Sequence, residues 1–194
     1  MKRFRKILIV LLAILVPVSI GFGFNFFSGE SSDSAENQAM TVEGTLTINQ
    51  ISEAQNLVPG DKICKGVTMN ITSSAVSLLR VKVDIYCADS KTAETDIAPI
   101  KNAGDNWLKG SDGYYYYTQG VKNGDIVKLA EEGIYFNGLN DNVDMNKYQG
   151  KKIKVVANAE LVQAKHGVFA EKWGLSENKD GDIYTKLKKI SNDQ

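Results

Sequence analysis

Apolar and polar side chains alternate along much of the chain from Thr41 onward, and a period of two residues is typical of a strand with one buried face. The first such segment places Val42, Leu46 and Ile48 on one face, with polar residues between them. We therefore expect a half-buried strand at the start of the folded part of the chain.

The same period recurs more clearly at 63–71, 79–85 and 153–161. Turn-forming dipeptides separate these and several shorter segments, for example Pro59–Gly60 and Asp112–Gly113. About eight strands with short turns and no long helical pattern predict an all-β fold. The expected architecture over residues 41–174 is an antiparallel β-sandwich of the jelly-roll or immunoglobulin-like kind.

The first 28 residues follow a different pattern. Four basic residues within the first six positions precede an apolar run that continues with few interruptions to Phe27. A basic flank before an apolar segment is typical of a secretory signal peptide, and this length also suffices for one membrane-spanning helix. The residues leave open whether the leader is cleaved or kept as an anchor. In either case the chain from about Glu30 is expected outside the membrane.

Two further segments depart from the strand pattern. Residues 29–40 are small, polar and acidic, and they predict a flexible tether. Residues 175–194 are rich in charged side chains and predict a loosely held tail, in which 183–190 could form a short helix. The predicted order is therefore a leader (1–28), a tether (29–40), a sandwich domain (41–174) and a charged tail (175–194).

Positive and negative charges balance over the whole chain, with 23 lysine and arginine residues against 23 aspartate and glutamate residues. Without its basic leader the remaining chain is mildly acidic. A surface for nucleic acid is therefore not expected, and the membrane is a partner only through an uncleaved leader. The predicted location is secreted or cell surface.

The chain has two cysteines, Cys64 and Cys87, and a pair outside the cytoplasm is more often bridged than reduced. Cys87 falls on the apolar face of its predicted strand, whereas Cys64 falls on the face opposite to its apolar neighbours. A bulge at Gly66 would rotate Cys64 onto the apolar face. We predict a disulfide between them, with two unbridged thiols as the alternative.

Four consecutive tyrosines follow the turn at Asp112–Gly113. On a strand, Tyr114 and Tyr116 point to one face and Tyr115 and Tyr117 to the other. One pair is expected in the core. The other pair is either an exposed aromatic patch for a glycan or a neighbouring subunit, or is packed beneath a loop at the sheet edge.

Residues suited to catalysis are scarce. His166 is the only histidine, so the chain lacks a His-Glu-x-x-His zinc motif, and a lone histidine is expected to be structural or solvated. Two oxygen-rich stretches, 141–146 and 178–182, lack the ligand order and closing glutamate of an EF-hand, so we expect solvated loops rather than calcium sites. The prediction is a protein without enzyme activity, cofactor or metal site.

Several segments, taken in their order along the chain, resemble the TasA/camelysin group of exported proteins, and the resemblance covers about Thr41 to Gly174. The segments that carry it are the Leu-Val-Pro-Gly-Asp-Lys turn at 57–62, the asparagine-bearing strand end at 67–74, the Leu-Arg-Val strand at 79–83, Trp107, the Asp-Gly-Tyr-Tyr-Tyr hairpin at 112–116, the strand at 159–164, Ala170 and Trp173.

This resemblance implies a jelly-roll-like protein of a Gram-positive cell surface or biofilm matrix, which polymerises into a fibre by donating its N-terminal strand to the next subunit. The strand bearing Val42, Leu46 and Ile48 fits that role, because it alternates and follows a flexible tether. The partner is then another copy of the chain or another surface protein. A monomeric, membrane-tethered module that binds a glycan or protein is the alternative function.

Overall fold

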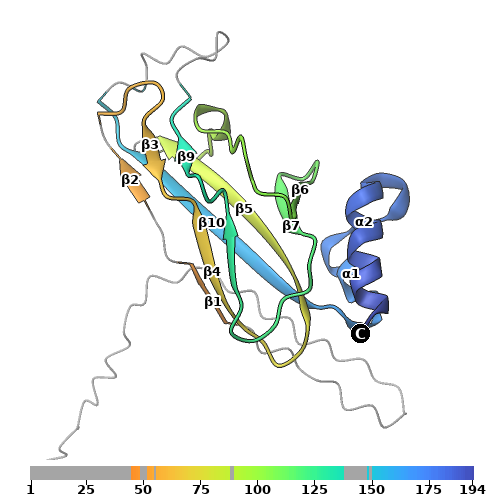
Figure 1. Ribbon diagram of the computed structural model, residues 1–194. Coiled ribbons are helices and arrows are strands. Elements are labelled where there is room, and N and C mark those ends of the chain that lie inside the picture. Colours follow the sequence, from red (N-terminus) through yellow and green to blue (C-terminus); the bar gives the residue numbers. More distant parts are fainter. Residues whose placement is uncertain (1–44, 49–51, 55, 88–89, 138–147, 149) are drawn as a thin grey trace, which may run out of the picture.

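The computed structural model describes residues 45–48, 52–54, 56–87, 90–137, 148 and 150–194, and most of their regular structure is antiparallel β-strand (Figure 1). The prediction of an all-β fold is confirmed at this level. The strands are β1 (Thr45–Ile48), β2 (Ser52–Ala54), β3 (Lys62–Cys64), β4 (Val67–Thr72), β5 (Ser77–Cys87), β6 (Trp107–Lys109), β7 (Tyr114–Tyr117), β8 (Ile126–Leu129), β9 (Ile134–Tyr135) and β10 (Ile153–Gln163).

The longest strands, β5 and β10, lie at the centre of a five-stranded sheet with the order β2-β10-β5-β7-β6. They pair antiparallel without a break, from Ser77 opposite Gln163 to Cys87 opposite Ile153. Both carry valine and isoleucine at alternate positions, and β-branched side chains favour a pleated surface. The alternation at 79–85 and 153–161 therefore predicted these two strands correctly.

A three-stranded sheet with the order β1-β4-β8 packs against the five-stranded sheet, and β3 and β9 form a separate pair. Buried residues of the smaller sheet, such as Met69 and Leu129, share one core with Val81 of β5 and Val155 of β10. The two sheets therefore bury a common apolar layer, as alternating strands require.

The connection between β3 and β4 turns at Gly66, whose φ is +92°. A Cβ atom here would lie 2.1 Å from the carbonyl oxygen of Ala130, so only glycine allows this close approach. The turn leaves Cys64 facing the common core, where both Cys64 and Cys87 are buried. The irregularity lies elsewhere than predicted, because the register of the β3–β9 pair shifts between Lys62 and Cys64 and not at Gly66.

The predicted disulfide is nevertheless absent, and both cysteines are thiols. Cys64 pairs with Ile134 in the small β3-β9 sheet, whereas Cys87 ends β5 opposite Ile153 of β10. Sharing a core does not bring two thiols to bonding geometry, which requires a close approach of the two Cβ atoms. Burial raises the pKa of the Cys64 thiol, which keeps it protonated and unreactive.

Two helices, α1 (Val168–Trp173) and α2 (Glu177–Asn192), cover part of the other face of the five-stranded sheet (Figure 1). Leu78 of β5 and Tyr116 of β7 join Phe169, Trp173 and Leu187 in a second buried cluster. Short 3-10 turns, η1 (Thr95–Ile97) and η3 (Lys165–Gly167), complete the regular structure of the described chain. The sheet therefore has a packed layer on each side.

The chain after residue 175, expected as a loose tail, is mostly helix α2. Ile183 and Leu187 lie four residues apart and are both buried, as on one face of a helix. The helical pattern is hard to see in the sequence because Gly181 interrupts it, with backbone angles outside the helical range. The charged residues that suggested a loose tail lie mainly on the exposed side of this helix.

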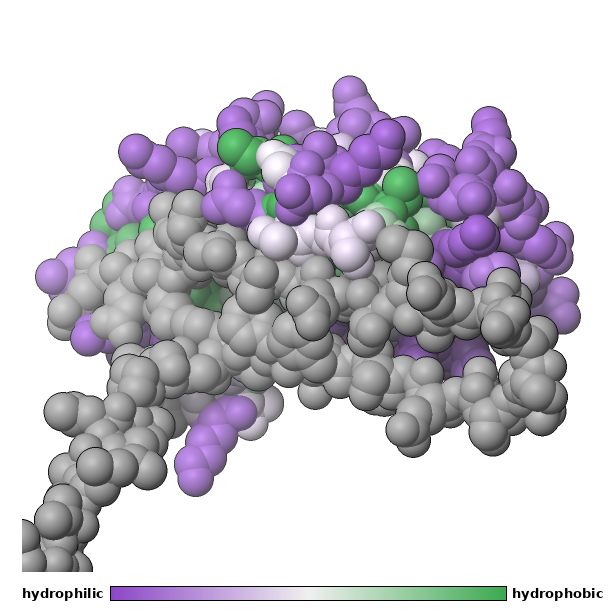
Figure 2. All heavy atoms as spheres, turned by 90° about the horizontal axis from the view of Figure 1, so that it is seen from below, coloured by the Kyte–Doolittle hydropathy of each residue, from purple (hydrophilic) through white to green (hydrophobic). Residues whose placement is uncertain are grey.

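The described part of the surface seen from below is mainly hydrophilic, with small separate hydrophobic areas (Figure 2). Large apolar side chains of the described chain that are well exposed are Val58, Ile126 and Tyr135. No helix within the described residues is long and apolar enough to cross a bilayer. The predicted leader, the tether and Val42 lie outside those residues.

Candidate functional site

The four tyrosines form strand β7, which lies between β5 and β6 in the five-stranded sheet. Tyr115 and Tyr117 pack on the core shared by the two sheets, whereas Tyr114 and Tyr116 pack on the cluster beneath the helices. Both faces of β7 are therefore covered. Tyr114 and Tyr117 are half-buried, and Tyr115 and Tyr116 are buried.

Beneath α1, Arg80 of β5 is the centre of the polar contacts. Its Nε and Nη2 atoms both donate to Oε2 of Glu160, at 3.0 and 2.8 Å. Its Nη1 donates to the hydroxyl of Tyr116 at 3.3 Å. Burial alone would lower the pKa of Arg80, but its hydrogen bonds to Tyr116 and Glu160 raise the pKa instead, so the guanidinium stays charged.

Aromatic rings enclose the same guanidinium. Its Cζ atom lies 3.9 Å from the ring centre of Tyr114 and 5.0 Å from that of Trp173. Contacts of a cation with ring faces at these distances are attractive. Because Trp173 belongs to α1 and Tyr114 to β7, Arg80 connects the helical layer to the sheet.

The tyrosine hydroxyls complete this cluster. Tyr114 donates to Oε1 of Glu160 at 2.9 Å, and Tyr116 donates to Oδ2 of Asp112 at 2.6 Å. Burial raises the pKa of both hydroxyls, and the hydrogen bonds to these carboxylates raise the pKa of each further. The groups satisfy one another, so the arrangement is suited to holding two layers together rather than to reacting with a substrate.

The first strand occupies the edge of the three-stranded sheet. β1 pairs antiparallel with β4 of the same chain, with Leu46 opposite Ile71 and Ile48 opposite Met69. Ile71 and Met69 are both buried in the common core. Two of the three residues predicted for assembly, Leu46 and Ile48, are thus paired within the subunit, and Val42 lies outside the described residues.

The residues considered for chemistry are dispersed. Residues 178–182 lie in the first half of α2, where Asp180 accepts a hydrogen bond from the backbone N–H of Ser176, and 141–146 are not among the described residues. Within the described chain, no cluster of three or more histidine, cysteine, aspartate or glutamate side chains could hold a metal. His166 is exposed in η3.

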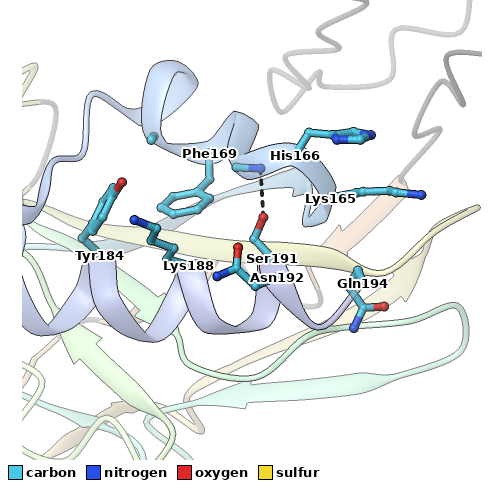
Figure 3. A pocket seen from close by; sticks show the side chains of 10 residues that line it. Lys165, His166, Phe169, Tyr184, Lys188, Ser191, Asn192 and Gln194 are labelled. Carbon is cyan, nitrogen blue, oxygen red and sulfur yellow. Dashed lines mark hydrogen bonds between the residues drawn. The ribbon is translucent and has the colours of Figure 1, made fainter. Parts of the chain in front are cut away.

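Sequence reasoning missed a cavity of about 460 Å³ at the C-terminal end of the described chain (Figure 3). We call it the C-terminal cavity. One wall comes from η3 and α1 and the other from α2, and the backbone N–H of Gly167 donates to Oγ of Ser191 at 2.8 Å between them. The lining residues are spread over 30 positions of the sequence, from Lys165 to Gln194, so no short sequence motif predicts the cavity.

No model of a known protein family matches this sequence, and the comparison with curated proteins gives no match. Interpretation of the molecule therefore depends on its own residues and geometry. Among the described residues, the edge strand β1 and the C-terminal cavity are two places where a partner or ligand could bind.

Proposed function

We propose that this protein is an exported structural subunit of a cell surface or biofilm matrix, and that its subunits join by exchanging their first strand. The fold in this proposal is a jelly-roll-like sandwich behind a leader that directs export. The support from the sequence is the basic and apolar leader, the polar tether and the resemblance to the TasA/camelysin group.

The observation that carries the proposal is the position of β1. It is a strand of four residues at the edge of its sheet, and among the described residues its backbone pairs with β4 alone. An edge strand joined to a flexible segment can leave its own sheet and be replaced by the same strand of a neighbour, with the same hydrogen bonds. Repeated from subunit to subunit, this exchange is open-ended and produces a fibre.

The experiment is site-specific crosslinking of assembled material. Thr47 of β1 lies directly opposite Asn70 of β4, and opposed residues on paired strands have Cβ atoms about 5 Å apart. Subunits with Thr47→Cys are mixed with subunits with Asn70→Cys under assembly conditions and treated with a short thiol crosslinker. If strands are exchanged, the crosslinker joins one subunit of each kind. The two kinds carry tags of different mass, so a joined pair is recognised by its combined mass.

A matched control uses a pair of strands that the exchange of β1 leaves intact. Lys154 of β10 lies opposite Tyr86 of β5, inside the five-stranded sheet. A mixture of Lys154→Cys and Tyr86→Cys subunits should give no joined pairs. If the Thr47 and Asn70 mixture behaves like this control, while a chain with both substitutions crosslinks internally, strand exchange is rejected.

A monomeric surface module that binds a ligand remains the second candidate function. The observation that favours it is the C-terminal cavity, which lies on the helical layer and is built only from residues after position 164. N-terminal sequencing and negative-stain microscopy of the protein from its own host separate the two candidates. Filaments of chains that lack the leader support the structural subunit, and dispersed particles that retain it support the tethered module.

A further inference from the structure

The C-terminal cavity is lined by basic, aromatic and amide side chains. It is open to solvent between η3 and α2, and its volume of about 460 Å³ falls within the range of small-molecule sites. The bond from Gly167 to Ser191 fixes the two walls relative to each other, as the dashed line in Figure 3 shows. The cavity is thus a formed feature of the helical layer.

The charge of the lining is one-sided. Lys165, His166 and Lys188 line the cavity, and no carboxylate side chain of the described residues lines it. An adjoining hollow, which shares Tyr184, Lys188 and Asn192 with it, is also lined by Glu177 and Asp193. The whole chain has equal numbers of acidic and basic residues, so this separation is local. In α2, Glu177 and Asp180 lie in the first turn, and Lys186, Lys188 and Lys189 lie in the second half of the helix. A concave basic site attracts an anionic group.

An apolar wall lies beside these charges. The rings of Phe169 and Tyr184 have centroids 5.7 Å apart, and Figure 3 shows them next to each other on the same side of the cavity. The ammonium of Lys188 lies 5.4 Å from the ring centre of Tyr184. An aromatic face next to a cation suits a ligand with C–H bonds on one side and a negative group close by.

Neutral hydrogen-bonding groups supply the remaining part of the lining. Asn192 contributes an amide, which offers both donors and an acceptor to hydroxyl groups. We propose that the C-terminal cavity binds an acidic sugar unit, with the ring of the sugar against Tyr184, the negative group at Lys188, and the hydroxyls at Asn192. This inference is independent of strand exchange, since β1 contributes nothing to the cavity.

Saturation-transfer NMR on the full-length chain in a non-ionic detergent tests the proposal. The probes are glucuronate, which has a ring and a charge, glucose, which has the ring alone, and acetate, which has the charge alone. We expect glucuronate to bind about tenfold more tightly than either of the other two, because only glucuronate uses both the ring of Tyr184 and the charge of Lys188.

The variant Lys188→Gln, at an exposed lysine of the lining, should weaken glucuronate binding about fivefold, as expected for one partly solvated charge. Lys186→Gln is the matched control, because Lys186 is exposed on the same helix but does not line the cavity. This control should leave glucuronate binding unchanged. Circular dichroism checks that both variants are folded.

Four results would overturn the inference. If glucose bound as tightly as glucuronate, the charge of the ligand would contribute nothing to binding. If acetate bound as tightly as glucuronate, the cavity would be a simple anion site. The same effect of Lys188→Gln and Lys186→Gln would show that the general charge of the helix is responsible. Absence of glucuronate binding at millimolar concentration would exclude a sugar site of this kind.

Discussion

At the scale of single residues, Arg80 departs clearly from its sequence pattern. Alternation along 79–85 assigns Arg80, Lys82 and Asp84 to one polar face, which a two-layer sandwich would leave in solvent. In the structure the side chain of Arg80 is only 11% exposed, whereas that of Lys82 is 41% exposed. Trp173 of the helical layer lies over the guanidinium of Arg80, whereas Lys82 remains partly exposed. Asp84 is also buried, and it accepts a hydrogen bond from the amide of Asn158.

Replacing Arg80 should therefore be costly. Arg80→Ala leaves the carboxylate of Glu160 without its guanidinium, and we expect the free energy of unfolding to fall by about 3 kcal/mol. Arg80→Lys keeps the charge but loses the two bonds made by Nε and Nη2, so we expect an intermediate loss of about 1–2 kcal/mol. Urea unfolding at neutral pH measures both values.

The control for Arg80 lies two residues away on the same face. Lys82→Ala removes a largely solvated lysine, and its effect should stay within about 0.5 kcal/mol. If Arg80→Ala were no more harmful than Lys82→Ala, the guanidinium would contribute nothing to holding α1 on the sheet.

The pKa of Tyr116 leads to a prediction about alkaline pH. Burial and the hydrogen bond to Asp112 raise this pKa, so the folded state holds the proton more tightly than the unfolded chain does. The resulting stabilisation is complete below about pH 10, the pKa of an unfolded tyrosine, and is lost as pH rises toward the folded pKa. We expect the free energy of unfolding to decline above about pH 10, and to decline less steeply in Tyr116→Phe.

Urea midpoints measured between about pH 8 and 11 follow this decline, which begins near the pKa of an unfolded tyrosine. Tyr135→Phe, at an exposed tyrosine of β9, is the comparison. In this variant the free energy of unfolding should fall with pH as steeply as in the unmodified chain. If the free energy of unfolding of Tyr116→Phe fell with pH as steeply as that of the unmodified chain, groups other than Tyr116 would cause the loss of stability at alkaline pH.

At the scale of elements, the strands with the cleanest alternation could be predicted, whereas α1 was missed and α2 was expected only as a possible short helix at 183–190. Strands β5 and β10 place apolar residues at every second position over long stretches, so their period stands out. Helix α1 is only six residues long, and α2 is broken at Gly181. The usable signals were the spacings of Phe169 to Trp173 and Ile183 to Leu187, which are short and lie among many charges.

The tyrosine strand shows the same limit for the candidate site. Alternation correctly separates Tyr115 and Tyr117 from Tyr114 and Tyr116. It does not reveal what covers the second pair, because the covering helices come from the far end of the sequence. The C-terminal cavity was missed for the same reason, since it exists only once η3, α1 and α2 have packed together.

The docking of α2 can be tested with Leu187, which is fully buried between the helix and the sheet. Leu187→Ala leaves a cavity in this cluster, and we expect a loss of about 3 kcal/mol in the free energy of unfolding. Lys186→Ala, on the exposed side of the same helix, should change stability by less than about 0.5 kcal/mol. Equal small effects would show that α2 is only weakly attached.

At the scale of the whole molecule, strand β5 belongs to two cores at once. Val81 faces the core between the sheets, and Leu78 faces the cluster under the helices. The two tryptophans divide in the same way, with Trp107 in the first core and Trp173 in the second. Because both cores depend on one strand, neither should persist when the other is lost.

Single-tryptophan variants make this measurable. Trp173→Phe leaves Trp107 as the reporter of the first core, and Trp107→Phe leaves Trp173 as the reporter of the second. Fluorescence of each variant during urea unfolding should match the circular dichroism of the same variant, as in a two-state transition. A fluorescence change of Trp173 that precedes the loss of β-structure would identify the helical layer as a separately unfolding unit.

The unequal lengths of the ladders also determine how the molecule would respond to tension. The β5–β10 ladder has eleven consecutive residue pairs and a span of about 35 Å, so a pull along it is shared among many hydrogen bonds in shear. The β1–β4 ladder has four pairs at an open edge. A load applied through the N-terminal end of the chain would therefore detach β1 first, and the rest of the domain would keep its form under that load.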